Sequence, residues 1–128
     1  MASKIEVDGL AGAGSAGVMT VVGEGGSTTT SLQQGLAKAW CRMDMTGTPS
    51  YHDSFNLGTI TDNGTGDMTF AITNAFGGAT FACTSGDGND NVLDEGITTT
   101  TARYVSRDNS GTKGDSNRAS FVAHGDLA

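Results

Sequence analysis

From residue 36 onward, the sequence consists of short runs in which apolar and polar residues alternate, separated by turns rich in Gly, Asn and Asp. In the run KAWCRMDM (38–45), every second side chain is small or apolar: Ala39, Cys41, Met43 and Met45. A period of two puts these side chains on one face of an extended chain, as in a half-buried β-strand. No ten-residue segment has the spacing of an amphipathic helix, so the pattern predicts an all-β protein.

A β-hairpin is predicted over residues 57–73. The segment MTFAIT alternates, with Met68, Phe70 and Ile72 on one face. Before it lies the dipeptide Asn63-Gly64, which favours a type I′ turn because both central positions of that turn need a positive φ. The sequon formed by Asn63, Gly64 and Thr65 is explained better by this turn than by glycosylation.

Further alternating runs lie at 79–85, 97–107 and 118–127, and the stretches 86–96 and 108–117 between them read as loops. Together these runs give six or seven short strands. Strands at this spacing, joined by turns, are typical of antiparallel all-β domains. We therefore expect residues 36–128 to form an antiparallel β-sandwich or a jelly-roll-like domain.

Residues 1–35 differ from the rest, because glycine clusters separate their short apolar runs. GAGSAG (12–17) matches the GxGxxG spacing of dinucleotide-binding loops. Such a loop must open a helix, whereas VMTVVG (18–23) is rich in β-branched residues and ends in glycine. We therefore interpret 1–35 as an extended Gly-rich arm that pairs with or wraps a partner, with 23–31 as a linker or extended segment.

Composition narrows the possible partners. Leu, Ile, Val and Phe together make up only 22 of 128 residues, which suggests burial against other subunits. The net charge of −7 argues against binding to nucleic acid or to an anionic membrane surface. No apolar run is long enough to cross a bilayer, and the N-terminus lacks the order of a signal peptide.

The acidic stretch 86–96 is the first candidate for a binding loop. Asp87, Asn89 and Asn91 match positions 1, 3 and 5 of a calcium-binding loop. Positions 6 and 12 should be Gly and Glu but are Val92 and Thr98, so the pattern fails at two defining places. A looser calcium site and a solvated loop both remain open. The looser site would use the carboxylates of Asp87, Asp90, Asp94 or Glu95.

Loops on a rigid scaffold often carry binding residues, so 86–96 and 108–117 are the predicted contact surfaces. The candidate residues are Asp87, Asn89, Asp90, Asn91, Asp94, Glu95, Asp108 and Asn109.

Catalytic chemistry is not indicated. Cys41 and Cys83 lie on predicted buried faces, and no neighbouring charge would activate either thiol. Their spacing fits no zinc motif, so both read as small buried apolar groups. His52 is expected at an exposed strand edge or turn and His124 at a surface or interface. We expect no enzymatic activity and no cofactor.

Several short motifs follow one another in a fixed order within residues 32–74. They are Lys38-Ala39-Trp40, Thr46-Gly47-Thr48, Asp53-Ser54-Phe55-Asn56 and the run from Thr59 to Asp67, TITDNGTGD. In these motifs the chain resembles a small β-domain found at the ends of tail-fibre-like proteins of marine and other tailed bacteriophages.

The resemblance implies a structural protein of the virion: a fibre, a tip or a capsid-attached appendage. It implies a homotrimer, no enzymatic activity and no catalytic residues, with the DNGTGD segment acting as a turn before a strand. Because only about 35 residues precede the domain, a short fibre, a head fibre or a capsid-decorating protein is expected rather than a complete tail fibre. The arm would anchor the chain to other virion proteins, and the loops could meet a glycan or protein of the host surface.

Two alternatives remain. One is a tail-fibre tip that binds a receptor. The other is a free carbohydrate-binding module, which usually aligns two or three aromatic side chains on a flat face. The candidates would be Trp40, Tyr51 and Tyr104, and no sequence spacing aligns them.

Overall fold

The computed structural model describes residues 9, 19–23, 25–86, 91–94 and 96–128. Backbone contacts divide the chain into two compact units, Met1–Gly35 and Leu36–Ala128. Each unit is described by itself below.

The described part of the first unit contains a small β-hairpin. Strand β1 (Thr20–Val22) pairs antiparallel with β2 (Thr29–Ser31), and the four-residue helix α1 (Leu32–Gly35) follows. The segment 23–31, predicted as a linker or an extended segment, thus contains a turn followed by the extended strand β2. The amide of Gly23 donates to the carbonyl of Thr28 at 2.8 Å, which closes the turn, and the β-branched threonines that follow suit a strand.

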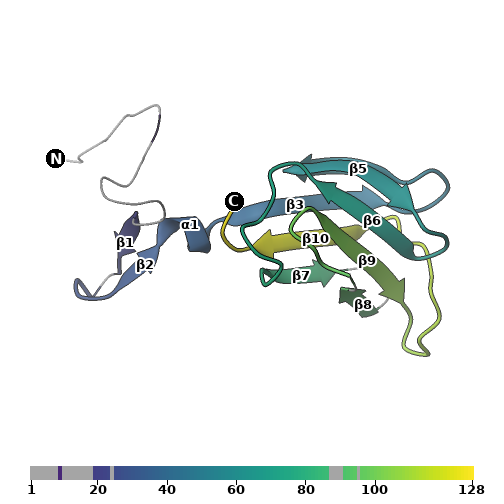
Figure 1. The fold of residues 1–128 in the computed structure, drawn as a ribbon. Helices are drawn as coiled ribbons and strands as arrows, with labels where there is room; N and C mark the ends of the chain where they lie inside the picture. Colours follow the sequence, from purple (N-terminus) through teal and green to yellow (C-terminus); the bar gives the residue numbers. More distant parts are fainter. Residues whose placement is uncertain (1–8, 10–18, 24, 87–90, 95) are drawn as a thin grey trace. The chain divides into compact units, whose positions relative to one another are not determined.

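The described residues of the second unit form eight antiparallel strands in two four-stranded sheets (Figure 1). The first sheet has the order β4-β3-β10-β7 and the second β5-β6-β9-β8. The strands are β3 (Ala37–Asp44), β4 (Ser50–Phe55), β5 (Leu57–Asp62), β6 (Asp67–Ile72), β7 (Ala82–Gly86), β8 (Asn91–Asp94), β9 (Thr101–Arg107) and β10 (Ala119–His124). The expectation of an all-β antiparallel protein is confirmed, with eight strands here rather than six or seven.

One hydrophobic core lies between the two sheets. The predicted inward residues of β3 and β6 are all buried, and so is the alternating set Ala119, Phe121 and Ala123 of β10. The rings of Phe70, from the second sheet, and Phe121, from the first, lie 5.6 Å apart between centroids. Such a tilted aromatic contact across the layers joins the two sheets.

Two strands begin later than their alternating patterns predict. Strand β9 starts at Thr101, because the Thr98 hydroxyl accepts hydrogen bonds from the amides of Thr100 and Thr101 and so favours a turn there. Strand β7 starts at Ala82. Before it, the ring of Phe81 stacks on Phe76 at 4.0 Å between centroids, which fixes the chain outside the ladder.

Candidate functional site

The first predicted contact loop, 86–96, is partly a strand. Asn91 and Asp94 lie in β8, which pairs with β9 so that Asn91 is opposite Arg107 and Asp94 is opposite Tyr104. Their assignment to a free loop is therefore wrong. The apolar pair Val92-Leu93 lies between them in the same strand, and a four-residue strand is too short to stand out in an acidic stretch. Asp87, Asn89, Asp90 and Glu95 lie outside the described residues.

The second predicted contact loop is a tight turn that uses its own polar groups. The Asp108 carboxylate accepts hydrogen bonds from the amides of Ser110 (2.9 Å) and Thr112 (2.8 Å) and from the Ser110 hydroxyl (2.6 Å). The Ser110 hydroxyl bond is the main reason that the pKa of Asp108 lies below its usual value. Asn109 is exposed at the tip of this turn. The turn is therefore held by Asp108, which leaves its carboxylate little capacity for a ligand.

The DNGTGD segment forms the predicted hairpin, but not with the predicted turn. Among the described non-glycine residues only Asn56 has a positive φ, so Asn63 cannot occupy a type I′ position. Instead, four residues connect β5 to β6, and Gly64 and Gly66 take the positive φ values of 114° and 66°. The Asp62 carboxylate accepts a hydrogen bond from the Gly64 amide at 2.8 Å, which favours this four-residue loop over a two-residue turn.

Asp67, the last residue of this segment, is the buried centre of an ion cluster. Its carboxylate accepts a hydrogen bond from Arg103 Nε at 2.8 Å and forms ion pairs with Arg103 Nη2 and Lys113 Nζ. Asn63 Nδ2 donates a further bond at 3.2 Å. The Arg103 guanidinium is the main reason that the pKa of Asp67 lies well below its usual range, and Lys113 and Asn63 add to the effect. The cluster ties three separate segments together.

Gly66 packs tightly against the 106–114 region. A Cβ on Gly66 would lie 2.7 Å from the amide nitrogen of Gly114 and 2.8 Å from the carbonyl oxygen of Ser106. The Gly66 amide also donates to the Asp115 carboxylate at 2.6 Å. Only glycine combines this close approach with a positive φ. The DNGTGD segment therefore packs the β5–β6 turn tightly against the 106–115 region.

The side chains considered for nucleophilic catalysis are the two cysteines and the two histidines. Burial raises the pKa of the Cys41 thiol to about 12, so this thiol stays protonated. Cys41 is buried as predicted, whereas Cys83 is only half-buried. His52 lies exposed on the edge strand β4, as expected, and its Nε2 is 3.4 Å from the Asn117 carbonyl. Within the described ranges, no three His, Cys, Asp or Glu side chains converge where a metal ion could bind.

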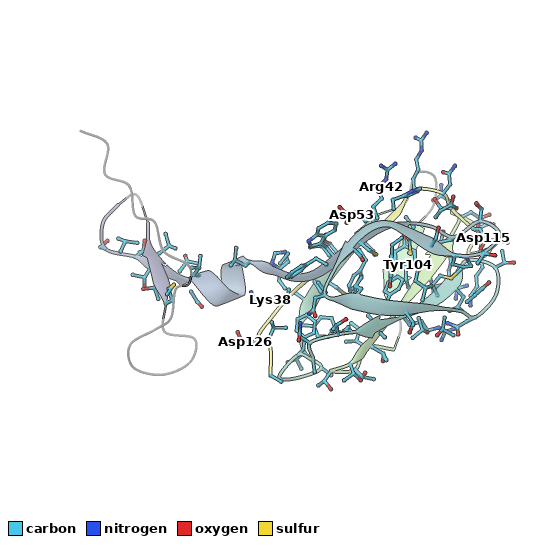
Figure 2. All side chains as sticks on the ribbon, turned by 90° about the horizontal axis from the view of Figure 1, so that it is seen from above. Lys38, Arg42, Asp53, Tyr104, Asp115 and Asp126 are labelled. Atoms are coloured by element: carbon cyan, nitrogen blue, oxygen red, sulfur yellow. The ribbon has the colours of Figure 1, made fainter. Side chains whose placement is uncertain are left out.

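The outer face of the first sheet carries a group of side chains that sequence reasoning missed. Trp40 on β3 is directly opposite Phe55 on β4, and Arg42 is directly opposite Asp53. Because Ala39 and Cys41 point into the core, alternation turns Trp40 and Arg42 outward. Figure 2 shows Arg42 and Asp53 next to each other on the same side of the second unit. We call Trp40, Phe55, Arg42 and Asp53 the aromatic face.

The aromatic face differs from the platform considered from sequence. Tyr104 is 1% exposed and its hydroxyl donates to the Gly86 carbonyl, and Tyr51 packs against the core. Neither can join Trp40 on a surface. The partner of Trp40 is Phe55, which is 52% exposed. Alternation in 38–45 already places Trp40 outward, but pairing it with Phe55 needs the β3–β4 register, which contains an irregularity after Arg42.

Comparisons of this chain with protein-family models, with curated proteins and with solved structures find no significant match. The part of the chain that the structure describes contains no helix with the length and hydropathy of a membrane span.

Proposed function

We propose that this chain is a structural protein of the virion of a tailed bacteriophage, a short fibre or a capsid-decorating appendage without enzymatic activity. The observation that carries the proposal is the role of the segments in which the chain resembles phage fibre domains. The KAW segment belongs to β3, which lines the core, and the DNGTGD segment forms the turn fixed by Asp67. Segments that build the framework of the domain suit a structural protein.

We interpret residues 36–128 as a β-sandwich. The two sheets share one core, as the Phe70–Phe121 contact illustrates. Consecutive strands are neighbours within one sheet in the hairpins β3–β4, β5–β6 and β8–β9. A sandwich assembled from hairpins accounts for this order better than a jelly roll, whose strands are wound between the sheets as Greek keys.

Residues 1–35 act, in this proposal, as the arm that holds the protein on the particle and its copies to one another. The hairpin β1–β2 has three residues in each strand, and Val21 and Val22 are 52% and 58% exposed. A two-stranded hairpin is marginally stable alone in water. Burial of its valines against a capsid or tail protein, or against other copies in a homotrimer, would stabilise it.

Deletion of residues 1–35 tests the proposal. Tagged full-length chain and the tagged 36–128 fragment are each produced in host cells during infection, and purified particles are probed for the tag. We expect the full-length chain on particles and the fragment in the unbound fraction, with circular dichroism confirming that the fragment is folded. A folded fragment found equally on particles would refute the anchor. Absence of the full-length chain from particles would refute the virion assignment.

A further inference from the structure

We propose that the aromatic face binds a neutral saccharide. This inference rests on the proposed function, because it gives a virion protein a chemical means of touching the host surface. It starts from the aromatic side chains. Of the eight in the sequence, six make ring-to-ring contacts: Tyr51, Phe70, Phe76, Phe81, Tyr104 and Phe121.

Trp40 and Phe55 make no such ring contact in the part of the chain that the structure describes. They are also direct partners across β3 and β4, so their Cβ atoms lie about 5 Å apart on one face. Trp40 is half-buried and Phe55 is 52% exposed. Val122, opposite Trp40 on β10, continues the apolar row. Two unpaired rings side by side form a surface on which the C–H groups of a sugar ring can stack.

Polar groups lie at one side of these rings. Arg42 and Asp53 are both exposed and are cross-strand partners, two positions along from Trp40 and Phe55. No ion pair joins them among the described residues. A guanidinium offers a fork of donors, and the Asp53 carboxylate, whose Oδ1 accepts a hydrogen bond from the Ser54 amide at 2.8 Å, still offers Oδ2 as an acceptor. Neighbouring sugar hydroxyls both donate and accept, so this pair matches them.

Charge selects a neutral ligand. Arg42 and Asp53 cancel each other on the face, while the chain as a whole carries −7. An acidic polysaccharide or a nucleic acid would be repelled by that net charge without a compensating basic patch. A neutral sugar meets no such barrier, and the balanced pair still provides directional hydrogen bonds.

Area argues against a second protein chain as the occupant. Two aromatic side chains bury at most about 300–500 Å² together. A stable protein interface buries about 800 Å² on each partner. Because Arg42 and Asp53 interrupt the apolar row, the face suits a ligand of a few sugar rings rather than another copy of the chain.

The test uses the full-length chain on an array of neutral bacterial and plant polysaccharides with acidic ones alongside. We expect binding to at least one neutral polysaccharide, weakened at least tenfold by Phe55→Ser and at least fivefold by Arg42→Gln. Leu36→Ser is the matched control, because it removes a similarly exposed apolar side chain (54%) that belongs neither to the aromatic face nor to the arm. Circular dichroism and light scattering would verify that each variant keeps its fold and molar mass.

Three results would overturn the inference. They are no binding to any neutral polysaccharide, equal binding by the wild type and Phe55→Ser, or tighter binding to acidic polysaccharides. A change in molar mass on Phe55→Ser would assign the face to contacts between copies instead. Detection of the chain on particles is a separate readout. Chain on particles without saccharide binding contradicts only this inference, and Phe55-dependent binding without attachment contradicts only the proposed function.

Discussion

Asp67 links three segments that are distant in sequence. Arg103 and Lys113 lie 36 and 46 residues further along the chain, yet both meet this one carboxylate. The sequence places Asp67 at the start of an alternating run but contains no signal for its partners, because side-chain pairing across strands depends on register. Burial of the carboxylate is tolerated because two cationic side chains contact it.

Replacement of Asp67 by Asn should destabilise the protein at neutral pH. We expect a loss of about 2 kcal/mol in the free energy of unfolding, below the ~3–5 kcal/mol for a fully buried pair. The reason is that the Arg103 and Lys113 side chains remain 38% and 32% exposed and can be solvated. Urea denaturation of the wild type and Asp67→Asn would measure the difference, with Asp53→Asn as a control at an exposed carboxylate.

The difference in stability between the wild type and the Asp67→Asn variant should depend on pH. The pKa of Asp67 is lowered in the folded protein, so its contribution is fully present above the unfolded pKa of about 3.9 and is lost as the pH falls below that value. The stability difference between wild type and Asp67→Asn should therefore stay constant from about pH 7 to about pH 5 and shrink toward about pH 3. A difference that grew on acidification would contradict the ion cluster.

Among the elements, long alternating runs are predicted well and short ones are not. The inward faces of β3, β6 and β10 follow directly from a period of two, because each run continues for at least six residues. Strands β2 and β8 have three and four residues, too few for any period to be visible. The aromatic face was missed for a different reason. Alternation predicts one of its two strands, β3, but it predicts neither β4 nor the register that pairs the two strands.

The β5–β6 hairpin depends on the close contact of Gly66 with the backbone of Ser106 and Gly114. Gly66→Ala should cost about 2–4 kcal/mol, since it combines a positive φ with a Cβ less than 3 Å from backbone atoms of Ser106 and Gly114. Gly111→Ala is the matched control. Gly111 also has a positive φ (84°) but has open space around it, so only about 1 kcal/mol is expected. Thermal unfolding of both variants would separate backbone strain from steric conflict, and equal losses would contradict the packing of the two turns.

At the scale of the whole molecule, the chain has few large apolar residues with which to form a hydrophobic core. The core of the second unit consists mainly of Met, Ala and aromatic side chains together with Cys41. It contains few Val and Leu side chains. The first unit leaves Val21 and Val22 exposed on a hairpin that has little cover in the described residues. Two of the four exposed large apolar side chains of the described residues thus lie in the arm, and the other two, Leu36 and Phe55, lie in the second unit. Association of copies through the arm is the arrangement that would bury the valines.

Light scattering tests this arrangement directly. We expect the full-length chain to have a molar mass of about three times 13.0 kDa and the 36–128 fragment to be a monomer. The fragment should remain folded, because its core residues, including Phe70, Phe121 and Tyr104, all come from within it. A trimeric fragment would move the subunit contacts to the sheets, and the aromatic face would then be the first surface to examine. A monomeric full-length chain would leave the valines of β1 to a capsid or tail protein alone.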